Sequence, residues 1–289
     1  MFEMEEIKLT FSYVKNIKVS ILEKIETFIT EEAEEFGVAK NKYLTEIFKN
    51  FDFEYVPQKR SKIYTEKTKY IQFTVPKEAL EKYEILEKRD IVIADYCRDM
   101  LDKFLALSKV KREQIILKDR LEMIKEAISK NMRLDFTTKN GTSMVEPYEI
   151  IEDITYDKNY IICYKEELDG VVTYSLRNIK NIKKRKDFQE YYYVDMEIAK
   201  NNFDPFLSYD SIVKIKITPE GEKIFNRKKQ LRPKVLKKEK DIWELQCTSY
   251  KALLYFISFF DEVEILEPES LRKTLIEKIN KMYKLYNEK

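Results

Sequence analysis

Two stretches of the chain carry one pattern, and this repeat decides the expected fold of the N-terminal part. The copies read NIKVSILEKIETFITEEAEEFGVAKNKYLTEIFKNF (residues 16–51) and YIQFTVPKEALEKYEILEKRDIVIADYCRDMLDKF (residues 70–104). Each copy begins with alternating apolar residues, as in a strand with one buried face, and continues with two amphipathic helical patterns. The strands recur at an offset of 54 residues and the second helices at an offset of 53. One strand and two short helices cannot bury a strand edge alone, so we expect the copies to pair strand to strand.

The helix boundaries in the repeat have their own local signals. Gly37 is suited to end the first helix of copy one, and Pro76 to begin the first helix of copy two. The apolar face expected for the first helix of copy one comprises Ile25, Phe28, Ile29, Ala33 and Phe36.

The composition argues against most classes of enzyme. The 289 residues include no histidine, which removes Ser-His and Cys-His nucleophile pairs, His-ligated metals and an imidazole proton shuttle. The four glycines are isolated, so no glycine-rich phosphate loop is present. No pair of carboxylates stands out by its spacing. We therefore expect a non-enzymatic binding or regulatory protein, with no catalytic residue, cofactor or metal.

The cysteines and the N-terminal residues indicate the compartment. Cys97, Cys163 and Cys247 lie too far apart for a CxxC metal site or an evident disulfide framework, so we interpret them as reduced, mostly buried thiols. Residues 1–16 are acidic and carry no long apolar run, which argues against a signal peptide or a membrane span. These features favour a cytoplasmic protein that does not bind a membrane.

The charge is unevenly distributed. The 54 basic and 52 acidic side chains nearly cancel, but residues 1–112 are net 0, residues 113–207 net −3 and residues 208–289 net +5. Six cations and no acid lie between Arg177 and Lys186, and eight cations and one acid between Arg227 and Lys240. One such run is typical of a solvated face, whereas two in a nearly neutral chain favour binding to a polyanion.

The repeat in residues 1–112 resembles the ribbon-helix-helix family, here with two copies fused in tandem. In that family the paired strands enter the DNA major groove. The resemblance implies that the outer face of the ribbon carries Lys18 and Ser20 from copy one and Gln72 and Thr74 from copy two. The alternative is a structural or dimerising module with ordinary exposed strand residues, which the net charge of zero favours.

Residues 113–207 are expected to form a helical lead-in followed by a small, strongly bent sheet. The helical pattern covers residues 115–130. The expected strands are MRLDFTT, TSMVEPYEII, NYIICY, VVTYSLRNI and KNIKKR. Asn140-Gly141 and Asp169-Gly170 lie between pairs of these strands and are suited to tight hairpins.

This part resembles the WYL family of bacterial regulators, which has an Sm-like or SH3-like β-barrel. The matching segments are AISKNMRLDF (residues 127–136), residues 145–148, Asn159-Tyr160-Ile161 and residues 174–179, and only the tyrosine of the namesake Trp-Tyr-Leu is retained. Where the family has arginines lining a basic ligand site, this chain has Ser143, Ser175 and Asn178. Strand alternation would place Arg177 on the other face, so the neighbouring run at 180–186 is the alternative place for an anion.

Aromatic residues follow that cationic run directly. They are Phe188, Tyr191, Tyr192 and Tyr193. Cations beside aromatic rings suit single-stranded nucleic acid, because the cations follow the phosphates and the rings stack on splayed bases. Core packing of a tyrosine-rich strand explains the same pattern equally well.

Residues 208–289 have a βαββαβ pattern followed by a final helix, which predicts a ferredoxin-like sandwich. The same region resembles the C-terminal extension that follows WYL barrels, for which dimerisation is expected. Trp243 is interpreted as a core residue. The apolar stripe of the final helix comprises Leu271, Leu275, Ile279 and Met282. The overall expectation is an α+β chain with a tandem ribbon-helix-helix domain, a WYL barrel and a ferredoxin-like extension.

The combination of these parts is similar to the WYL accessory proteins of type VI-D CRISPR systems. That resemblance implies an RNA-binding homodimer that enhances an RNA-guided ribonuclease. The candidate binding residues at the barrel edge are Tyr160, Tyr174, Ser175, Arg177, Lys180, Lys183, Lys184, Arg185 and Lys186. Those of the second run are Arg227, Lys228, Lys229, Arg232, Lys234, Lys237 and Lys238. Two alternatives remain open: a regulator that binds duplex DNA through the ribbon and senses a ligand in the barrel, and an interaction scaffold.

Overall fold

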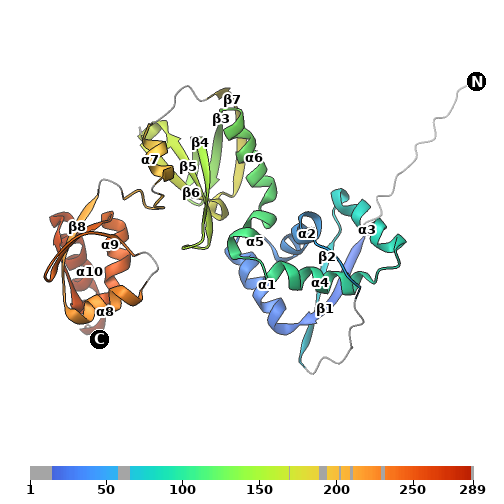
Figure 1. The fold of residues 1–289 in the computed structure, drawn as a ribbon, viewed down its shortest axis with the longest axis horizontal. Helices are drawn as coiled ribbons and strands as arrows, with labels where there is room; N and C mark the ends of the chain where they lie inside the picture. Colours follow the sequence, from blue (N-terminus) through green and yellow to red (C-terminus); the bar gives the residue numbers. More distant parts are fainter. Residues whose placement is uncertain are drawn as a thin grey trace, which may run out of the picture.

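The chain is an α+β protein built on three antiparallel sheets (Figure 1). The computed structural model describes residues 15–57, 66–168, 170–188, 194–201, 203–208, 211–228 and 232–287. Within these ranges, no helix has the length and apolar character needed to cross a membrane.

The N-terminal unit consists of two strand-helix-helix repeats, as the sequence predicts. Its elements are β1 (Asn16–Leu22), α1 (Glu23–Glu35), α2 (Lys40–Asn50), β2 (Thr68–Thr74), η1 (Lys77–Ala79), α3 (Leu80–Lys88) and α4 (Ile93–Leu105). Strands β1 and β2 pair antiparallel, with Lys18 opposite Gln72. The alternating apolar residues of both strands, such as Val19 and Phe73, are buried against the helices.

Local chemistry explains where the helices of this unit begin and end. Gly37 adopts a φ of +67° after α1, and the amides of Gly37 and Val38 donate to the carbonyls of Glu34 and Ala33. This is the left-handed helix end that glycine favours. Pro76 directly precedes η1, also as expected. One expectation was wrong. Phe28, expected on the buried face of the first helix, is 41% exposed, and the Arg112 guanidinium lies over its ring.

The middle unit begins with α5 (Lys109–Ile116) and α6 (Lys118–Ser129), which lead from the N-terminal unit to a five-stranded sheet (Figure 1). The sheet order is β6-β5-β4-β3-β7. The strands, with the helices that follow them, are β3 (Met132–Thr138), β4 (Gly141–Asp153), β5 (Lys158–Lys165), η2 (Glu166–Leu168), β6 (Gly170–Ser175), η3 (Leu176–Asn178), β7 (Asn181–Phe188) and α7 (Val194–Asn201). The strand expected over VVTYSLRNI therefore ends at Ser175. Arg177 lies in η3 instead, so strand alternation does not determine the direction of its side chain.

The five-stranded sheet is strongly curled. Strands β3 and β6 are not neighbours in it, yet the rings of Phe136 and Tyr174 meet edge to face with 5.4 Å between centroids. The two edge strands, β6 and β7, are joined only by η3, Ile179 and Lys180. Helix α6 packs against β3, β4 and β7, and α7 packs against β4, β5 and β6.

The C-terminal unit has the βαββαβ order that the sequence predicts, followed by a long helix. Its elements are β8 (Ile212–Ile217), α8 (Pro219–Arg227), β9 (Lys234–Glu239), β10 (Ile242–Gln246), α9 (Ser249–Phe256), η4 (Ile257–Glu262), β11 (Val263–Glu267) and α10 (Glu269–Asn287). The sheet order is β11-β8-β10-β9, and every pair is antiparallel. Trp243 is buried in this core, as expected.

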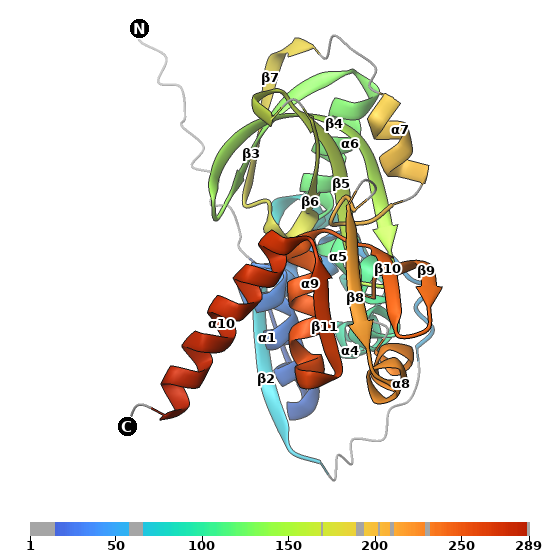
Figure 2. The same cartoon turned by 90° about the vertical axis from the view of Figure 1, so that its left-hand side faces the viewer.

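Helix α10 packs on its own unit only at its start. Leu271 is buried and Leu275 contacts the core, but Ile279 and Met282 are 52% and 45% exposed. Figure 2 shows the second half of α10 extending away from the C-terminal sheet. The expected stripe is therefore present on the helix, but half of it has no packing partner among the described residues.

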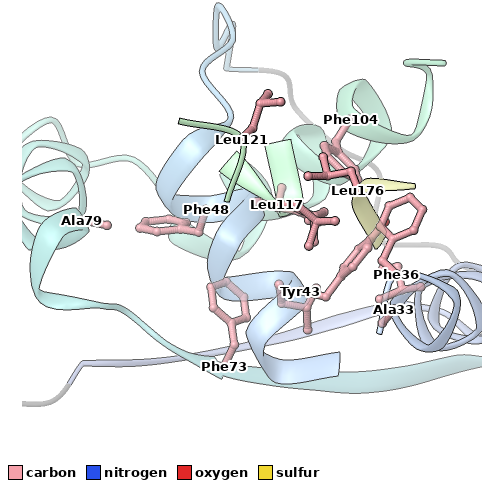
Figure 3. Close-up of a cluster of buried hydrophobic side chains, with 14 of the residues drawn as sticks. Ala33, Phe36, Tyr43, Phe48, Phe73, Ala79, Phe104, Leu117, Leu121 and Leu176 are labelled. Atoms are coloured by element: carbon pink, nitrogen blue, oxygen red, sulfur yellow. The ribbon is translucent and has the colours of Figure 1, made fainter. Parts of the chain in front are cut away.

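The first two units share one continuous hydrophobic core. It runs from Ile17 of β1 to Ile182 of β7, while the C-terminal unit has a core of its own. Figure 3 shows Leu176 of η3 in the same cluster as Phe36, Tyr43 and Phe104 of the N-terminal unit. The middle sheet is thus joined to the N-terminal unit through α5 and η3. All three cysteines are buried and free, as expected, and burial raises the pKa of their thiols.

Candidate nucleic-acid interface

A cavity of about 620 Å³ lies where the N-terminal unit meets the middle sheet. We call it the α1–β6 cavity. Its walls come from the end of α1, from α6, from the β3–β4 hairpin and from β6 with η3. The lining residues are Glu34, Glu35, Gly37, Arg120, Thr138, Lys139, Asn140, Thr173, Tyr174, Ser175, Arg177, Asn178 and Lys180. It brings together the predicted site residues of β6 and η3 and adds residues from three other elements.

Arg177 is buried and bonded within the protein, whereas its position in the cationic run suggested an exposed cation. It is 8% exposed. Its Nε donates to Glu113 at 2.8 Å, its Nη2 donates to the Asp157 carbonyl at 2.6 Å, and its Nη1 donates to Glu35. The guanidinium also lies 5.0 Å from the centre of the Phe36 ring. These contacts tie η3 to α5 and α1 and use the donors that a phosphate would need.

The predicted site residues of β5 and β6 differ in accessibility. Tyr160 is buried with its ring 5.4 Å from that of Phe203, and burial raises the pKa of its phenol to about 12. Tyr174 is half-buried at the cavity. Ser175 is 7% exposed and its Oγ has no hydrogen-bond partner. Tyr160 is thus a packing residue, whereas Tyr174 and Ser175 remain part of the candidate site.

Cations without acidic partners line the cavity. Within the described part of the chain, Arg120, Lys139 and Lys180 form no ion pair or side-chain hydrogen bond. Arg120 is half-buried, and desolvation lowers its pKa. Sequence reasoning found Lys180 but missed Arg120 and Lys139. Lys139 adjoins the Asn140-Gly141 turn signal, whereas Arg120 lies outside every cationic run, so only the packing of α6 reveals it.

The predicted cations of β7 divide into two kinds. Lys184 pairs with Glu126, and Arg185 pairs with Asp135 at 3.2 Å. Lys183 and Lys186 are exposed, and no partner for them occurs in the described ranges. Lys180 directly precedes β7, whereas Lys183 and Lys186 lie within it. The side chain of Phe188 and the whole of Tyr191–Tyr193 lie outside the described residues.

The C-terminal cationic run is largely engaged by its own unit. The Lys228 ammonium donates to the Tyr255 carbonyl and to Ser258, and desolvation lowers its pKa. Arg232 donates to two backbone carbonyls, those of Lys228 and Asn226. Lys237 pairs with Glu239, and Lys238 pairs with Glu222 while lying over the Trp243 ring. Arg227 and Lys234 are exposed, and Lys229 lies outside the described residues.

The outer face of the β1–β2 ribbon carries the predicted Lys18, Ser20, Gln72 and Thr74. The Thr74 hydroxyl donates to Asn16 at 2.9 Å. Tyr70, opposite Ser20, is 70% exposed, and the Lys18 ammonium lies 4.7 Å from its ring centre. Sequence reasoning missed Asn16 and Tyr70, although strand alternation places both on this face.

Comparisons with known proteins report on the fold. No family model and no curated protein matches the chain. One solved structure, described as that of a CRISPR Cas-related protein, aligns with a TM-score of 0.73 over 95% of each chain at 15% identity. This chain shares the fold of that CRISPR Cas-related protein. A second structure, proteasome accessory factor B/C (PafBC) of Arthrobacter aurescens, is 18% identical over 55% of this chain and 25% of its own. Its TM-score is 0.29, which is too low to support any argument.

Proposed function

We propose that this chain is a non-enzymatic accessory protein of a CRISPR system, which binds single-stranded RNA and enhances a type VI-D RNA-guided ribonuclease. The observation that carries the proposal is the set of cations at the α1–β6 cavity and along β7 that lack acidic partners. These are Arg120, Lys139, Lys180, Lys183 and Lys186. Because these cations gather at one cavity and along the adjoining strand, a polyanion bound there would meet several of them at once. The fold shared with a CRISPR Cas-related protein supports the biological setting.

The proposal includes the finer fold assignments. The antiparallel β1–β2 ribbon with two helices after each strand supports a tandem ribbon-helix-helix domain. The curled sheet supports a WYL-type barrel, and the order β11-β8-β10-β9 supports a ferredoxin-like extension. Three buried, free cysteines support a cytoplasmic location, because thiols persist in a reducing compartment.

A single strand suits this interface better than a duplex. Arg120, Lys139 and Lys180 line a cavity rather than an open surface on which a duplex could lie. Half-buried Tyr174 lines the same cavity. An unpaired base can leave the stack and enter such a cavity, whereas a paired base would first have to be flipped out. The cations along β7 would then follow the adjoining phosphates.

Duplex DNA is the second candidate ligand, and one observation favours it. The outer face of the ribbon presents Lys18, Gln72 and exposed Tyr70 with their polar groups outward. Lysine and glutamine suit guanine and adenine edges in the major groove, as a transcription regulator would require. In that case the α1–β6 cavity would be the place for a sensed ligand.

We also propose that the protein is a homodimer that pairs through α10. Helix α10 carries the apolar residues Leu275, Ile276, Ile279, Met282, Leu285 and Tyr286, and all of them except Leu275 are exposed. In an antiparallel pair centred between residues 280 and 281, Ile279 would face Met282 of a second copy. The apolar positions are thus self-complementary, which a twofold interface requires. If the apolar residues of α10 bind a different partner instead, the isolated protein will be a monomer.

Titration of labelled single-stranded RNA, single-stranded DNA and duplex DNA at several salt concentrations tests the proposed function. We expect tighter binding to single strands than to duplex, weakening steeply with salt, and faster target cleavage when the protein is added to a type VI-D effector. Operator-selective duplex binding that is lost in a Lys18→Ala/Gln72→Ala variant would favour the regulator instead. Absence of binding to all three would leave only an interaction scaffold.

A further inference from the structure

We infer that residues 203–208 form a strap that fixes the C-terminal unit to the middle unit, with Lys251 of α9 as the residue that positions it. In the proposed homodimer this strap holds the two RNA-binding surfaces at one spacing, so that a strand long enough to reach both binds more tightly than a short one. That consequence rests on the proposed function and adds to it how two copies share one RNA. The strap reads Phe-Asp-Pro-Phe-Leu-Ser and makes contacts with both units.

The strap is attached to the middle unit by packing and by one hydrogen bond. The rings of Phe203 and Tyr160 lie 5.4 Å apart between centroids. Phe203 and Leu207 also pack on a small core that β5 and α7 form. The Thr173 hydroxyl of β6 donates to the Pro205 carbonyl at 2.7 Å. These contacts hold the strap on the middle sheet.

The same strap is bonded to the first turn of α9 in the C-terminal unit. The Lys251 ammonium lies 3.1 and 3.2 Å from the two carboxylate oxygens of Asp204. It also lies 5.4 Å from the centre of the Phe206 ring. The buried Ser208 hydroxyl accepts from the amide of Thr248 at 3.3 Å, and Thr248 is the N-cap of α9.

The strap is a tight turn rather than a flexible linker, which would be rich in glycine and serine. A carboxylate oxygen of Asp204 accepts from the Phe206 amide at 3.1 Å, and the Asp204 carbonyl accepts from the Leu207 amide at 2.9 Å. Leu207 has a φ of +49°, a backbone conformation that leucine rarely adopts. Such a conformation persists only where the surrounding contacts enforce it.

The Asp204–Lys251 pair makes the attachment strong. Among the described residues, the C-terminal unit shares no hydrophobic core with the middle unit, so its orientation depends on the strap. The Phe206 ring spans the junction, 6.4 Å from that of Tyr156 and 6.3 Å from that of Tyr250. Lys251 is 5% exposed, and Asp204 is its only carboxylate partner in the described ranges. Turning the C-terminal unit away would leave a buried ammonium without its partner, which is strongly unfavourable.

A fixed C-terminal unit has a consequence for RNA binding in a dimer that pairs through α10. The attachment then sets the distance between the two copies of the cations Lys180, Lys183 and Lys186. A strand bound to one set meets the second set at a high effective concentration. A mobile C-terminal unit would spread the spacing and lower that concentration.

The distance between the units tests the strap directly. Nitroxide labels at Lys125→Cys on α6 and Asn226→Cys on α8 report it by double electron–electron resonance, in the full chain diluted with unlabelled protein. Both positions are exposed, and the native cysteines are buried. We expect one narrow distribution with the intact strap and a broad one in Asp204→Ala, because the unpaired Lys251 ammonium must turn toward water. The control Asp261→Ala removes an exposed carboxylate from η4 and should leave the distribution narrow.

A double variant separates the charge pair from the loss of a side chain. In Asp204→Ala/Lys251→Met neither charge remains, and the methionine can pack over Phe206 where the lysine stem lay, so the distribution should narrow again. Thermal melting shows that each variant is folded. A distribution that is broad with the intact strap, or equally narrow in Asp204→Ala, would overturn the inference.

RNA affinity tests the consequence for binding. Fluorescence anisotropy compares oligouridines of about 10 and about 40 nucleotides, of which the first is long enough for one surface only. We expect the wild type to bind the long strand about tenfold more tightly, and Asp204→Ala to lose most of this preference while its affinity for the short strand stays within about twofold. Equal affinity of the wild type for both lengths, or an unchanged preference in Asp204→Ala, would overturn the shared spacing. A wild type that binds neither RNA would overturn the proposed function, whereas the distance measurement would still decide whether the strap fixes the units.

Discussion

The Nε of Arg177 lies 2.8 Å from Oε1 of Glu113, and this buried pair fixes η3 to α5 across 64 residues of sequence. Glu113 also accepts from the backbone and side-chain amides of Asn159, so one fully buried carboxylate holds α5, β5 and η3 together. The pair therefore determines where the middle sheet sits against the N-terminal unit. The shape of the α1–β6 cavity depends on it.

Arg177→Ala should destabilise the chain strongly. The substitution leaves Glu113 buried without its cation, and breaking a buried pair from one side typically costs about 3–5 kcal/mol. Arg185→Ala, a matched control on β7, should cost less than about 1 kcal/mol because its pair with Asp135 is 44% exposed on the arginine side. Urea unfolding measures both free energies, and equal small losses would show that the buried pair is not required.

Glu126 should make the stability of the α6–β7 contact depend on pH. Lys130 and Lys184 lower the pKa of Glu126 to about 2, from an ordinary value of 4.5. Since the folded pKa is the lower one, the stabilisation is complete above about 4.5 and is lost as the pH falls through about 2. The stability difference between the wild type and Glu126→Gln should therefore shrink below pH 4.5. A difference that is constant across this range would contradict the assignment.

Lys183 and Lys186 should contribute to RNA binding mainly through counterion release. For single strands the slope of log affinity against log salt changes by about 0.7 per phosphate contact, so the double alanine variant should flatten it by about 1.4. A control variant, Lys223→Ala/Lys273→Ala, removes the same charge from lysines that pair with Glu220 and Glu269. Its slope should stay close to that of the wild type. Equal changes in both variants would mean that only net charge matters.

Ile279→Asp should convert the proposed dimer to a folded monomer. Ile279 is 52% exposed within the chain, so the substitution disturbs no core, but it places a carboxylate opposite Met282 of the second copy. Sedimentation velocity measures the change, and Asn280→Ala, an exposed position beside it, serves as control. A wild type that sediments as a monomer would refute the pairing through α10.

Much of the fold follows from local patterns. The alternation of residues 17–21 and 71–75, the glycine at 37 and the proline at 76 each predict an element boundary that the structure contains. The β3–β4 hairpin is predicted equally well by Asn140-Gly141. The misplaced strand end at Ser175 has a tertiary cause, because the buried bonds of Arg177 hold η3 in place of continued strand.

The candidate site was only partly predictable. The cationic runs identified Lys180, Lys183 and Lys186, but a run does not reveal which of its members have acidic partners. The run predicts Arg177 and Lys184 as binding cations, but their partners Glu113 and Glu126 come from distant helices. Arg120 stands alone in the sequence and joins the candidate site only because α6 packs against β3, which places Arg120 at the same cavity as η3.

The sequence by itself determined the order of strands and helices, because periodicity, turn residues and helix ends are local properties of the chain. It also determined that no histidine is available for chemistry. Only the tertiary structure decided which charges are neutralised, which aromatic rings are buried and where a cavity remains. Those properties depend on distances between residues far apart in the chain, and a side chain such as Arg120 acquires its chemistry from neighbours that folding supplies.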